Sequence, residues 1–530
     1  MTEPLTAASP DVTRNGAHAL IRTLVDAGVD TCFMNPGTSE MHFVAALDDV
    51  PEMHSVLALF EGVATGAADG YARIAERPAA VLLHLGPGLG NGLANLHNAR
   101  RGHTPIVNIV GDHATYHAKY DAPLQSDIES IARGVSGWIR SSSDAATVAD
   151  DAADAVAASY GPPGQVATLV LPADVCWSES PGPVAPRPVP QRTRVEAATI
   201  ESIADVLRSG EPAALLLGGV AVREPGLVAG SRVAGATGAK FLSETFPSRL
   251  ERGEGVPAIE RLGYLAEFAQ AQLGGLSHLV LVGATSPVSF FAYPDSASDL
   301  GPEGCTVHVL AAPGDDAVTA LADLAEVLGA PADGAQLAAA FRPERPRGDL
   351  NAQTFAEAIG ATLPEDVIVV DEGNTGGLFV AGFTGGAPRH DWLCLPGGAI
   401  GYGMPVATGA AIAAPDRKVL NVQADGSAMY TFQSLWTQVR EGLDVVTLIL
   451  NNQSYAILNL ELSRVGADPG PKALEMLDLT NPTIDFVSLA TGLGAHATRA
   501  TTAEELTEQL EVAFATPGPH LIEAILPPTL

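Results

Sequence analysis

The fold of this chain is decided by the stretch Val419-Leu420-Asn421-Val422-Gln423-Ala424-Asp425-Gly426-Ser427. Its apolar first half predicts a buried strand, and the Asp-Gly-Ser sequence predicts a tight turn into a helix. A second apolar run, residues 445–450, ends at Asn451 and Asn452. Because parallel strands deliver their carboxyl ends to one edge of a sheet, the two segments are expected to meet there. Free amides at a helix start bind a diphosphate, and Asp425 and Asn452 offer oxygen ligands suited to Mg²⁺. The stretch therefore predicts a magnesium and diphosphate site.

The composition limits the number of domains and the classes of partner that the chain can have. The chain has 530 residues, of which 46% are hydrophobic and 17% charged, so two or three packed domains are expected. A formal net charge of −32 argues against partners such as nucleic acids or anionic membranes. No apolar stretch reaches ~18 residues and no secretory signal pattern opens the chain, so a membrane protein is not expected. Four cysteines match no metal-binding spacing and predict reduced thiols in a cytoplasmic protein: Cys32, Cys176, Cys305 and Cys394.

Two proline-rich stretches, residues 178–194 and 331–350, predict linkers, because proline cannot continue a helix or join a strand ladder. Each of the three segments that they separate alternates apolar strands with helical patterns. The expected fold class is α/β, with three doubly wound parallel-sheet domains. Their predicted limits are residues 12–180, 195–335 and 350–530.

The spacing between Asp425 and Asn452 is 452 − 425 = 27 residues and resembles the signature of thiamine diphosphate (ThDP) enzymes. The resemblance implies that Asp425, Asn452 and the backbone carbonyl of Ser454 bind the Mg²⁺ that bridges the cofactor's diphosphate. The family usually has glycine where this chain has Ala424, which matters only if that residue needs a positive φ.

The three-part layout is similar to that of the ThDP-dependent 2-oxo acid decarboxylase and acetohydroxyacid synthase superfamily. That resemblance names the segments as aminopyrimidine-binding, middle and diphosphate-binding domains. It also implies a homodimer or homotetramer with active sites at the subunit interface.

Glu61 lies in the segment Phe60-Glu61-Gly62-Val63-Ala64-Thr65-Gly66, which closely resembles the family's segment around its cofactor-activating glutamate. A carboxylate that hydrogen-bonds a pyrimidine nitrogen favours the imino tautomer, whose nitrogen takes a proton from the thiazolium carbon. Burial would raise the pKa of Glu61 and help it to share that proton. The alternative is a glutamate placed at a helix start by the helix dipole.

Other positions follow from the same resemblance. Ile400 stands 425 − 400 = 25 residues before Asp425, where the family places a bulky aliphatic side chain that holds the cofactor bent. A core isoleucine is the alternative. The remaining cofactor contacts that the resemblance implies are Glu372, Asn374, Thr375, Gly426, Ser427, Asn452 and Tyr455.

His84 points to one branch of the superfamily. The run Leu83-His84-Leu85-Gly86-Pro87-Gly88 resembles benzoylformate decarboxylase, in which a histidine at this place transfers protons. Asn-Pro-Gly-Thr at residues 35–38 resembles the same branch and implies that Thr38, or the adjacent Ser39, lies near the substrate carboxylate. A structural histidine and ordinary turn chemistry are the alternatives.

Two departures qualify that branch. It carries a second catalytic histidine in the middle domain, where this chain has Ala292 by position, so proton delivery from that side is in doubt. Acetohydroxyacid synthases carry an arginine for the substrate carboxylate where this chain has Gly283-Ala284-Thr285-Ser286-Pro287. The overall amino-acid sequence nevertheless resembles those of proteins called acetolactate synthase large-subunit-like. No motif supports FAD, which true acetohydroxyacid synthases bind.

A few further residues are candidates for the substrate pocket. His113 is expected in the pocket and His117 is expected to be structural, because a zinc site would lack a third ligand. Downstream of Asn452, a helix that includes Ile457, Leu458 and Glu461 is expected at the pocket, as in relatives. Ile457 and Leu458 suggest an apolar acyl pocket, and a surface position is the alternative for Glu461.

The predicted function is a ThDP- and Mg²⁺-dependent decarboxylase or carboligase that is benzoylformate decarboxylase-like. It would cleave or form C–C bonds next to the carbonyl of a small 2-oxo acid, with an aldehyde or ketone as acceptor. The alternatives are an acetolactate synthase-like transferase and a ThDP-binding protein with little catalysis. An NAD-binding oxidoreductase rests only on generic glycine-rich turns and ranks below these.

Overall fold

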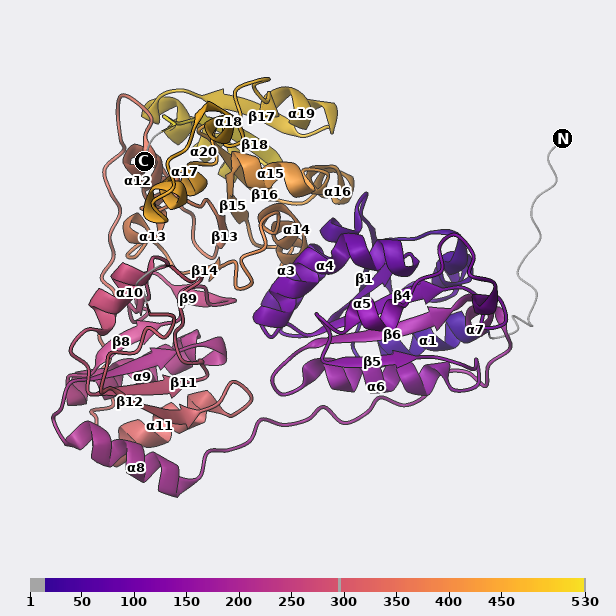
Figure 1. Ribbon diagram of the computed structural model, residues 1–530, viewed down its shortest axis with the longest axis horizontal. Coiled ribbons are helices and arrows are strands. Elements are labelled where there is room, and N and C mark those ends of the chain that lie inside the picture. The colour runs from indigo at the N-terminus through magenta and orange to yellow at the C-terminus, as the bar shows by residue number, and fades with distance from the viewer. Residues whose placement is uncertain (1–14, 294–296, 529–530) are drawn as a thin grey trace.

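The computed structural model describes residues 15–293 and 297–528. They form three sheets, of six, five and seven strands, with helices against the sheet faces (Figure 1). The predicted α/β class with three sheets is confirmed. The predicted domain limits at residues 12 and 530 lie outside the described residues. No helix within the described ranges is both long enough and apolar enough to cross a bilayer.

The first sheet is parallel throughout and has the strand order β2-β1-β3-β4-β6-β5. Helices cover both faces, so its central strands are apolar on both sides, as in the fully buried run Ala-Ala-Val-Leu-Leu of β3. The strands are β1 (Thr31–Asn35), β2 (His54–Leu57), β3 (Ala79–Leu83), β4 (Ile106–Asp112), β5 (Trp138–Ser141) and β6 (Val166–Pro172). The helices are α1 (Gly16–Asp26), α2 (Met41–Ala46), α3 (Glu61–Ala75), α4 (Leu85–Arg101), α5 (Ile128–Ala132), α6 (Val148–Tyr160) and α7 (Ala173–Trp177).

The second sheet is also parallel, with the order β10-β8-β7-β11-β12. The order reverses direction at β7, so the loops after β7 and β11 face one crevice. The strands are β7 (Ala213–Leu217), β8 (Lys240–Ser243), β10 (Glu260–Arg261), β11 (His278–Val282) and β12 (Thr306–Ala311). The helices are α8 (Ala197–Arg208), α9 (Glu224–Thr237), α10 (Ala266–Leu273) and α11 (Ala317–Val327).

The third sheet has the order β17-β18-β16-β15-β13-β14-β9. Its edge strand β9 (Leu250–Arg252) comes from the middle of the chain and is antiparallel to β14, which departs from the expectation of purely parallel sheets. A short antiparallel edge strand is common on otherwise parallel sheets. The other strands are β13 (Ile368–Glu372), β14 (His390–Leu393), β15 (Val419–Ala424), β16 (Val445–Asn451), β17 (His496–Ala500) and β18 (His520–Ile525).

The helices of the third part cover both faces of its sheet. They are α12 (Ala352–Thr362), α13 (Val380–Phe383), α14 (Gly403–Ala413), α15 (Asp425–Thr431), α16 (Ser434–Glu441), α17 (Ala456–Arg464), α18 (Pro471–Glu475), α19 (Phe486–Gly492) and α20 (Ala503–Ala515). The proline-rich segment between α7 and α8 contains no helix or named strand and spans from the first sheet to the second (Figure 1).

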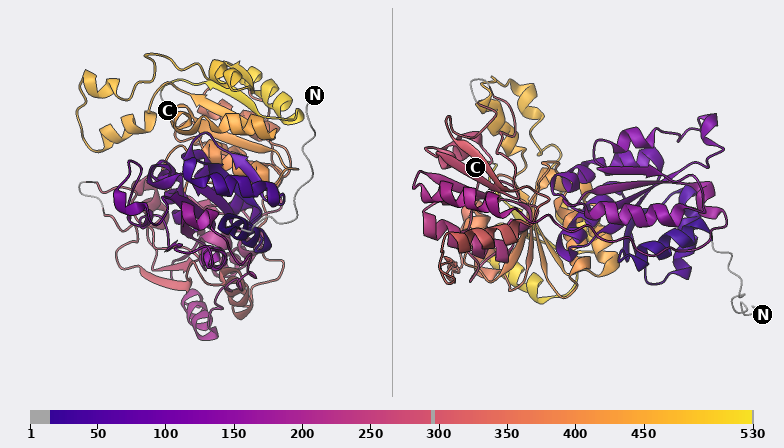
Figure 2. Two further views of the ribbon diagram at one scale, coloured as in Figure 1. Left: turned by 90° about the vertical axis from the view of Figure 1, so that its right-hand side faces the viewer. Right: turned by 90° about the horizontal axis from the view of Figure 1, so that it is seen from below.

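Helix α3 of the first part packs along α14 of the third (Figure 1). Small residues make this close approach possible. A Cβ atom added to Gly70 would lie 2.1 Å from the carbonyl oxygen of Val406, and one added to Gly409 would lie 1.8 Å from that of Ala67. Figure 2 shows that the first sheet otherwise stands apart from the other two, which lie close together.

Candidate active site

The predicted turn at Asp425 forms as expected. Asp425 is the first residue of α15 and directly follows β15. Its carboxylate accepts hydrogen bonds from the backbone amides of Gly426 and Gln453, each at 2.7 Å. Burial raises the pKa of Asp425, and these backbone donors oppose the shift. Ala424 has a φ of −69°, so the substitution of the family's usual glycine causes no backbone strain.

The predicted metal ligands share one pocket of about 340 Å³ at the carboxyl ends of β15 and β16. Asp425 and Asn452 both line it, as does Ser454, whose amide donates to the Asn452 side chain at 3.1 Å. One carboxylate, one amide oxygen and one backbone carbonyl suit Mg²⁺. Groups of three or more His, Cys, Asp or Glu side chains arranged for a metal are absent from the described residues. The complete lining is Gly373, Asn374, Thr375, Gly376, Ala424, Asp425, Gly426, Ser427, Leu450, Asn452, Ser454, Tyr455, Ala456 and Ile457.

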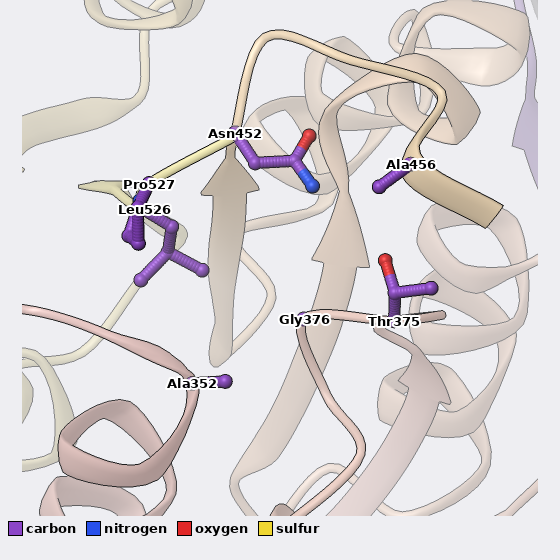
Figure 3. A pocket seen from close by; sticks show the side chains of 7 residues that line it. All are labelled: Ala352, Thr375, Gly376, Asn452, Ala456, Leu526 and Pro527. Carbon is purple, nitrogen blue, oxygen red and sulfur yellow. The ribbon is translucent and has the colours of Figure 1, made fainter. Parts of the chain in front are cut away.

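An adjoining pocket of about 280 Å³ extends the site behind Asn452. Figure 3 shows the amide of Asn452 and the hydroxyl of Thr375 pointing into the space between the strand end and Ala456. Asn374 donates to the hydroxyl of Ser427 at 3.1 Å. The ring of Tyr455 packs on Gly426, where an added Cβ would lie 2.4 Å from it. Most of the predicted diphosphate contacts are thus brought together.

Glu372, a predicted cofactor contact, lies at the end of β13. Its buried carboxylate accepts hydrogen bonds from the amides of Gly401 and Gly403, at 2.6 and 2.7 Å, and from the side chain of Gln423 at 2.9 Å. Burial raises its pKa, and these donors oppose that shift. We infer that Glu372 anchors the glycine-rich segment that carries Ile400. Ile400 directly precedes Gly401 and is half-buried.

Glu61 begins α3, and its half-buried carboxylate lies on the first part of the chain. The side-chain amide of Asn91 on α4 donates to its Oε2 at 2.9 Å. A Cβ added to Gly88 would lie 3.3 Å from Oε1. The other carboxylate oxygen therefore lies beside Gly88, which has no side chain to cover it.

His84 lies in the same part of the chain as Glu61. It is held by Glu40, a residue that the sequence did not indicate as functional. Its Nδ1 lies 2.8 Å from the carboxylate of Glu40, whose side chain is 1% exposed. Glu40 also accepts from the amide of Gly37 at 2.7 Å and from the hydroxyl of Ser39 at 2.5 Å. The pair fixes the ring so that its Nε2 is the nitrogen left for a reaction. The sequence feature that could have identified Glu40 is a glutamate three residues after the glycine of a turn, because the side chain of such a residue can bond back to the turn.

Two glycines make room for this pair. A Cβ on Gly37 would lie 2.3 Å from Nδ1 of His84, and one on Gly111 would lie 1.8 Å from the carboxylate of Glu40. Thr38 is exposed, whereas Ser39 lies 3.3 Å from His84 Nδ1. Of the two residues whose hydroxyls were predicted near the substrate, Ser39 is therefore the one that contacts His84.

The loop after β4 holds the two other histidines. The rings of His113 and His117 are 5.3 Å apart, and the segment between them contains a turn. His113 is half-buried and follows directly on the strand end that contacts Glu40, and His117 is exposed. His113 therefore lies near the Glu40 and His84 pair.

Of the remaining pocket candidates, Ile457 lines the pocket, whereas Leu458 is 44% exposed and Ala292 is exposed on its loop. Glu461 does not face the pocket freely, because it accepts hydrogen bonds from Tyr293 and Arg464.

Two halves of a site therefore exist on different parts of the chain. Every residue that lines the two pockets lies between positions 352 and 527, so none belongs to the first sheet with Glu61 and His84. Neither of these two pockets, as lined by the described residues, joins the halves within one chain.

Comparison with known proteins agrees with this geometry. Residues 14–132 match the thiamine pyrophosphate enzyme N-terminal TPP binding domain, and residues 377–524 match the corresponding C-terminal TPP binding domain. The chain is 62% identical to the "Putative acetolactate synthase large subunit IlvX" of Mycobacterium tuberculosis, over 97% of this chain and 99% of that protein. It is 31% identical to benzoylformate decarboxylase of Pseudomonas aeruginosa, over 94% and 96% of the two chains.

Among solved structures, the 4-hydroxybenzoylformate decarboxylase of Rhodococcus jostii RHA1 superposes with a TM-score of 0.84 at 25% identity, over 97% of this chain and 99% of that one. The predicted resemblance and the ThDP cofactor are thus confirmed at the level of the family. The acetolactate synthase-like alternative is supported better than the benzoylformate decarboxylase-like interpretation that the sequence placed first. The chain belongs to the thiamine pyrophosphate enzyme family.

Proposed function

We propose that the protein is a Mg²⁺-assisted ThDP enzyme that removes CO₂ from a 2-oxo acid and joins the remaining acyl group to a second carbonyl compound. This is an acetolactate synthase-like activity. The observation that carries the proposal is the 62% identity, over nearly the whole of both chains, to the IlvX protein. When bound, ThDP supplies a carbanion that adds to the carbonyl and stabilises the negative charge left by CO₂.

The residues present suit this cofactor. Asp425, Asn452 and the Ser454 carbonyl would hold Mg²⁺, since they line one pocket and provide only oxygen ligands. Gly426 and Ser427 at the start of α15 would contact the diphosphate. Glu61 would hydrogen-bond the aminopyrimidine, and Ile400 would hold the cofactor bent. Because Glu61 lines neither of the two pockets that Asp425 and Asn452 line, we propose a homodimer or homotetramer with shared sites.

The fate of the acyl group depends on proton supply. Release of an aldehyde requires a proton at the reacting carbon, whereas joining to an acceptor carbonyl forms a C–C bond there and places the proton on the acceptor oxygen. At the middle-domain position where decarboxylases carry a histidine, Ala292 has no proton to give. The hydroxyl of the neighbouring Tyr293 donates to Glu461 at 2.7 Å. The geometry on this side therefore favours ligation over protonation.

A second candidate is simple decarboxylation to an aldehyde. The pair of Glu40 and His84 favours it, because Nε2 of a histidine oriented by a carboxylate can act as a proton donor. In the ligation reaction the same nitrogen would protonate the acceptor oxygen. The pair thus serves both reactions, and only the products distinguish them.

FAD, which some acetohydroxyacid synthases bind in the middle domain, does not fit this chain. The crevice at β7 and β11 holds Glu244, which accepts from the amide of Gly219 at 3.3 Å. A Cβ on Gly218 would lie 3.0 Å from the Glu244 carboxyl carbon and 2.9 Å from the Gly283 oxygen. A dinucleotide diphosphate needs that glycine amide and a close backbone approach, and the Glu244 side chain already occupies the amide. We expect the purified enzyme to show no flavin absorbance, and stoichiometric flavin would refute this.

The test is product analysis with a panel of 2-oxo acids, alone and with aldehyde or ketone acceptors. Each reaction is run with ThDP and Mg²⁺ and after removal of the metal with EDTA. We expect 2-hydroxy-3-oxo acids or acyloins as main products, and no turnover without metal. Aldehyde as the main product would favour the second candidate. ThDP binding without turnover on any substrate would instead indicate a ThDP-binding protein with little catalysis.

A further inference from the structure

Helix α17 is one wall of the cofactor pocket. Ala456 and Ile457, in its first turn, line the pocket together with Asp425 and Asn452. The helix continues to Arg464, seven residues beyond Ile457. At 1.5 Å per residue this places the last turn about 10 Å from the pocket wall. A contact made by Arg464 therefore acts on the pocket only through the helix.

Arg464 links this last turn to the middle of the chain. Its Nη2 lies 2.8 Å from each carboxylate oxygen of Glu267 on α10. Its Nη1 donates to the hydroxyl of Tyr293 at 3.0 Å, and its guanidinium carbon lies 4.3 Å from the Tyr293 ring centroid. A planar guanidinium suits two-point binding to a carboxylate and stacking on an aromatic ring at the same time.

Glu461, one turn before Arg464, completes the cluster. It accepts from Arg464 at 2.8 Å and from the Tyr293 hydroxyl at 2.7 Å. The side chains of Arg464 and Glu461 are 14% and 18% exposed, so both charges are largely removed from water. The hydrogen bond to Glu267 raises the pKa of Arg464 well above its usual range. Because each polar group already has a partner, the cluster is built to hold α17 and not to bind a substrate.

Few other polar contacts restrain the helix. Within the described part of the chain, the hydrogen bonds of Arg464 and Glu461 are the only side-chain ones that join α17 to the middle-domain segment. Asn459 adds one bond to the adjacent Ser454. The residues that follow α17, at 465–468, are exposed. The far end of this pocket wall thus depends on the cluster around Arg464.

We propose that Arg464 is a positioning residue that clamps α17 onto the middle domain and so sets how closely Ile457, the candidate acyl-pocket residue at the start of α17, approaches the 2-oxo acid. The inference rests on the proposed function. It assigns the clamp to substrate binding and not to chemistry, since no clamp residue lines the pocket beside Asp425. The middle-domain loop that lacks a histidine at Ala292 would thereby contribute to the site through Tyr293.

The experiment compares Arg464→Gln, Glu267→Gln and the double variant with wild type, each as the ThDP- and Mg²⁺-loaded enzyme. We expect KM for the 2-oxo acid to rise about tenfold in Arg464→Gln, with kcat within about twofold. The double variant should match Arg464→Gln alone, because both changes break the same contact. Tyr293→Phe, which keeps the ring, should cause a smaller rise.

Arg389→Gln is the matched control. Arg389 also donates two hydrogen bonds to a glutamate, from Nη1 and Nη2 to Glu224 at 2.8 and 2.9 Å, and also joins the third part of the chain to the middle part. It lies outside both pocket linings. An unchanged KM in Arg464→Gln, or an equal rise in Arg389→Gln, would overturn the proposal.

Limited chymotrypsin digestion separates this inference from the proposed function. With the clamp broken, cleavage after the leucines of α17 should be several-fold faster in Arg464→Gln than in wild type or Arg389→Gln, whether or not any 2-oxo acid is turned over. Equal cleavage rates would refute the clamp. Absence of turnover in wild type would refute only the proposed function.

Discussion

At the scale of single residues, the most consequential side chain is the buried Glu40 beside His84. In Glu40→Gln the side chain keeps its size and can still accept from the Gly37 amide, but an amide is a weaker acceptor than a carboxylate for Nδ1 and orients the His84 ring less firmly. We expect kcat to fall about 10²-fold, within the range typical of general acid–base catalysis, with ThDP affinity unchanged. Steady-state kinetics and ThDP titration check this. Glu52→Gln, at an exposed pair with Arg22, is the control, and wild-type kcat in Glu40→Gln would remove the role.

A second residue links pH to stability. Burial raises the pKa of Glu244 from 4.5 to about 7. The unfolded chain releases this proton near pH 4.5 and the folded chain only near 7, so folding stability falls as pH rises through that window and stays lower above it. Glu244→Gln should therefore raise Tm relative to wild type at pH 8, with a much smaller difference at pH 4.5. Thermal scans of the apoenzyme at both values measure this. Equal effects of the substitution at both values would show that Glu244 ionises normally.

At the scale of elements, the contact between α3 and α14 depends on missing side chains. In Gly409→Val the new side chain would overlap the backbone of α3 at Ala67, since even a Cβ would lie 1.8 Å from its carbonyl oxygen. Overpacking of this kind costs about 1–3 kcal/mol or prevents folding. A lower urea midpoint or loss of soluble protein is the expected result. Gly492→Ala, an exposed helical position with open space around it, should leave the midpoint near wild type. Equal midpoints for the two variants would contradict the packing argument.

At the scale of the whole molecule, the separation of Glu61 from Asp425 predicts complementation between subunits. Glu61→Gln and Asp425→Asn should each be inactive alone. If a site takes Glu61 from one subunit and Asp425 from another, a mixed dimer has one intact site and one doubly altered site. After mild dissociation and random reassociation, half the dimers are mixed, so about a quarter of wild-type activity should return. Activity assays of the mixture measure this, with each variant reassociated alone as the control. No recovery in the mixture would place the complete site within one chain.

Much of the diphosphate half was predictable from sequence. Asp425, Gly426 and Asn452 lie where two parallel strands end, and local patterns determine both the strands and the turn after them. The three-sheet architecture followed from the same alternation of strands and helices, because that pattern repeats in each segment. The antiparallel strand β9 was not predicted, since it pairs with a strand that lies far along the chain.

The sequence by itself determined the class of fold, the cofactor family and the residues at strand ends, because these depend on contacts between near neighbours in the chain. Only the tertiary structure showed that Glu372 binds the backbone at 401–403, that Glu40 holds His84, and that Arg464 ties α17 to Tyr293. In each case a carboxylate or guanidinium finds its partner across a long sequence separation. Burial makes such polar groups depend on that partner, and no local pattern in the sequence identifies it.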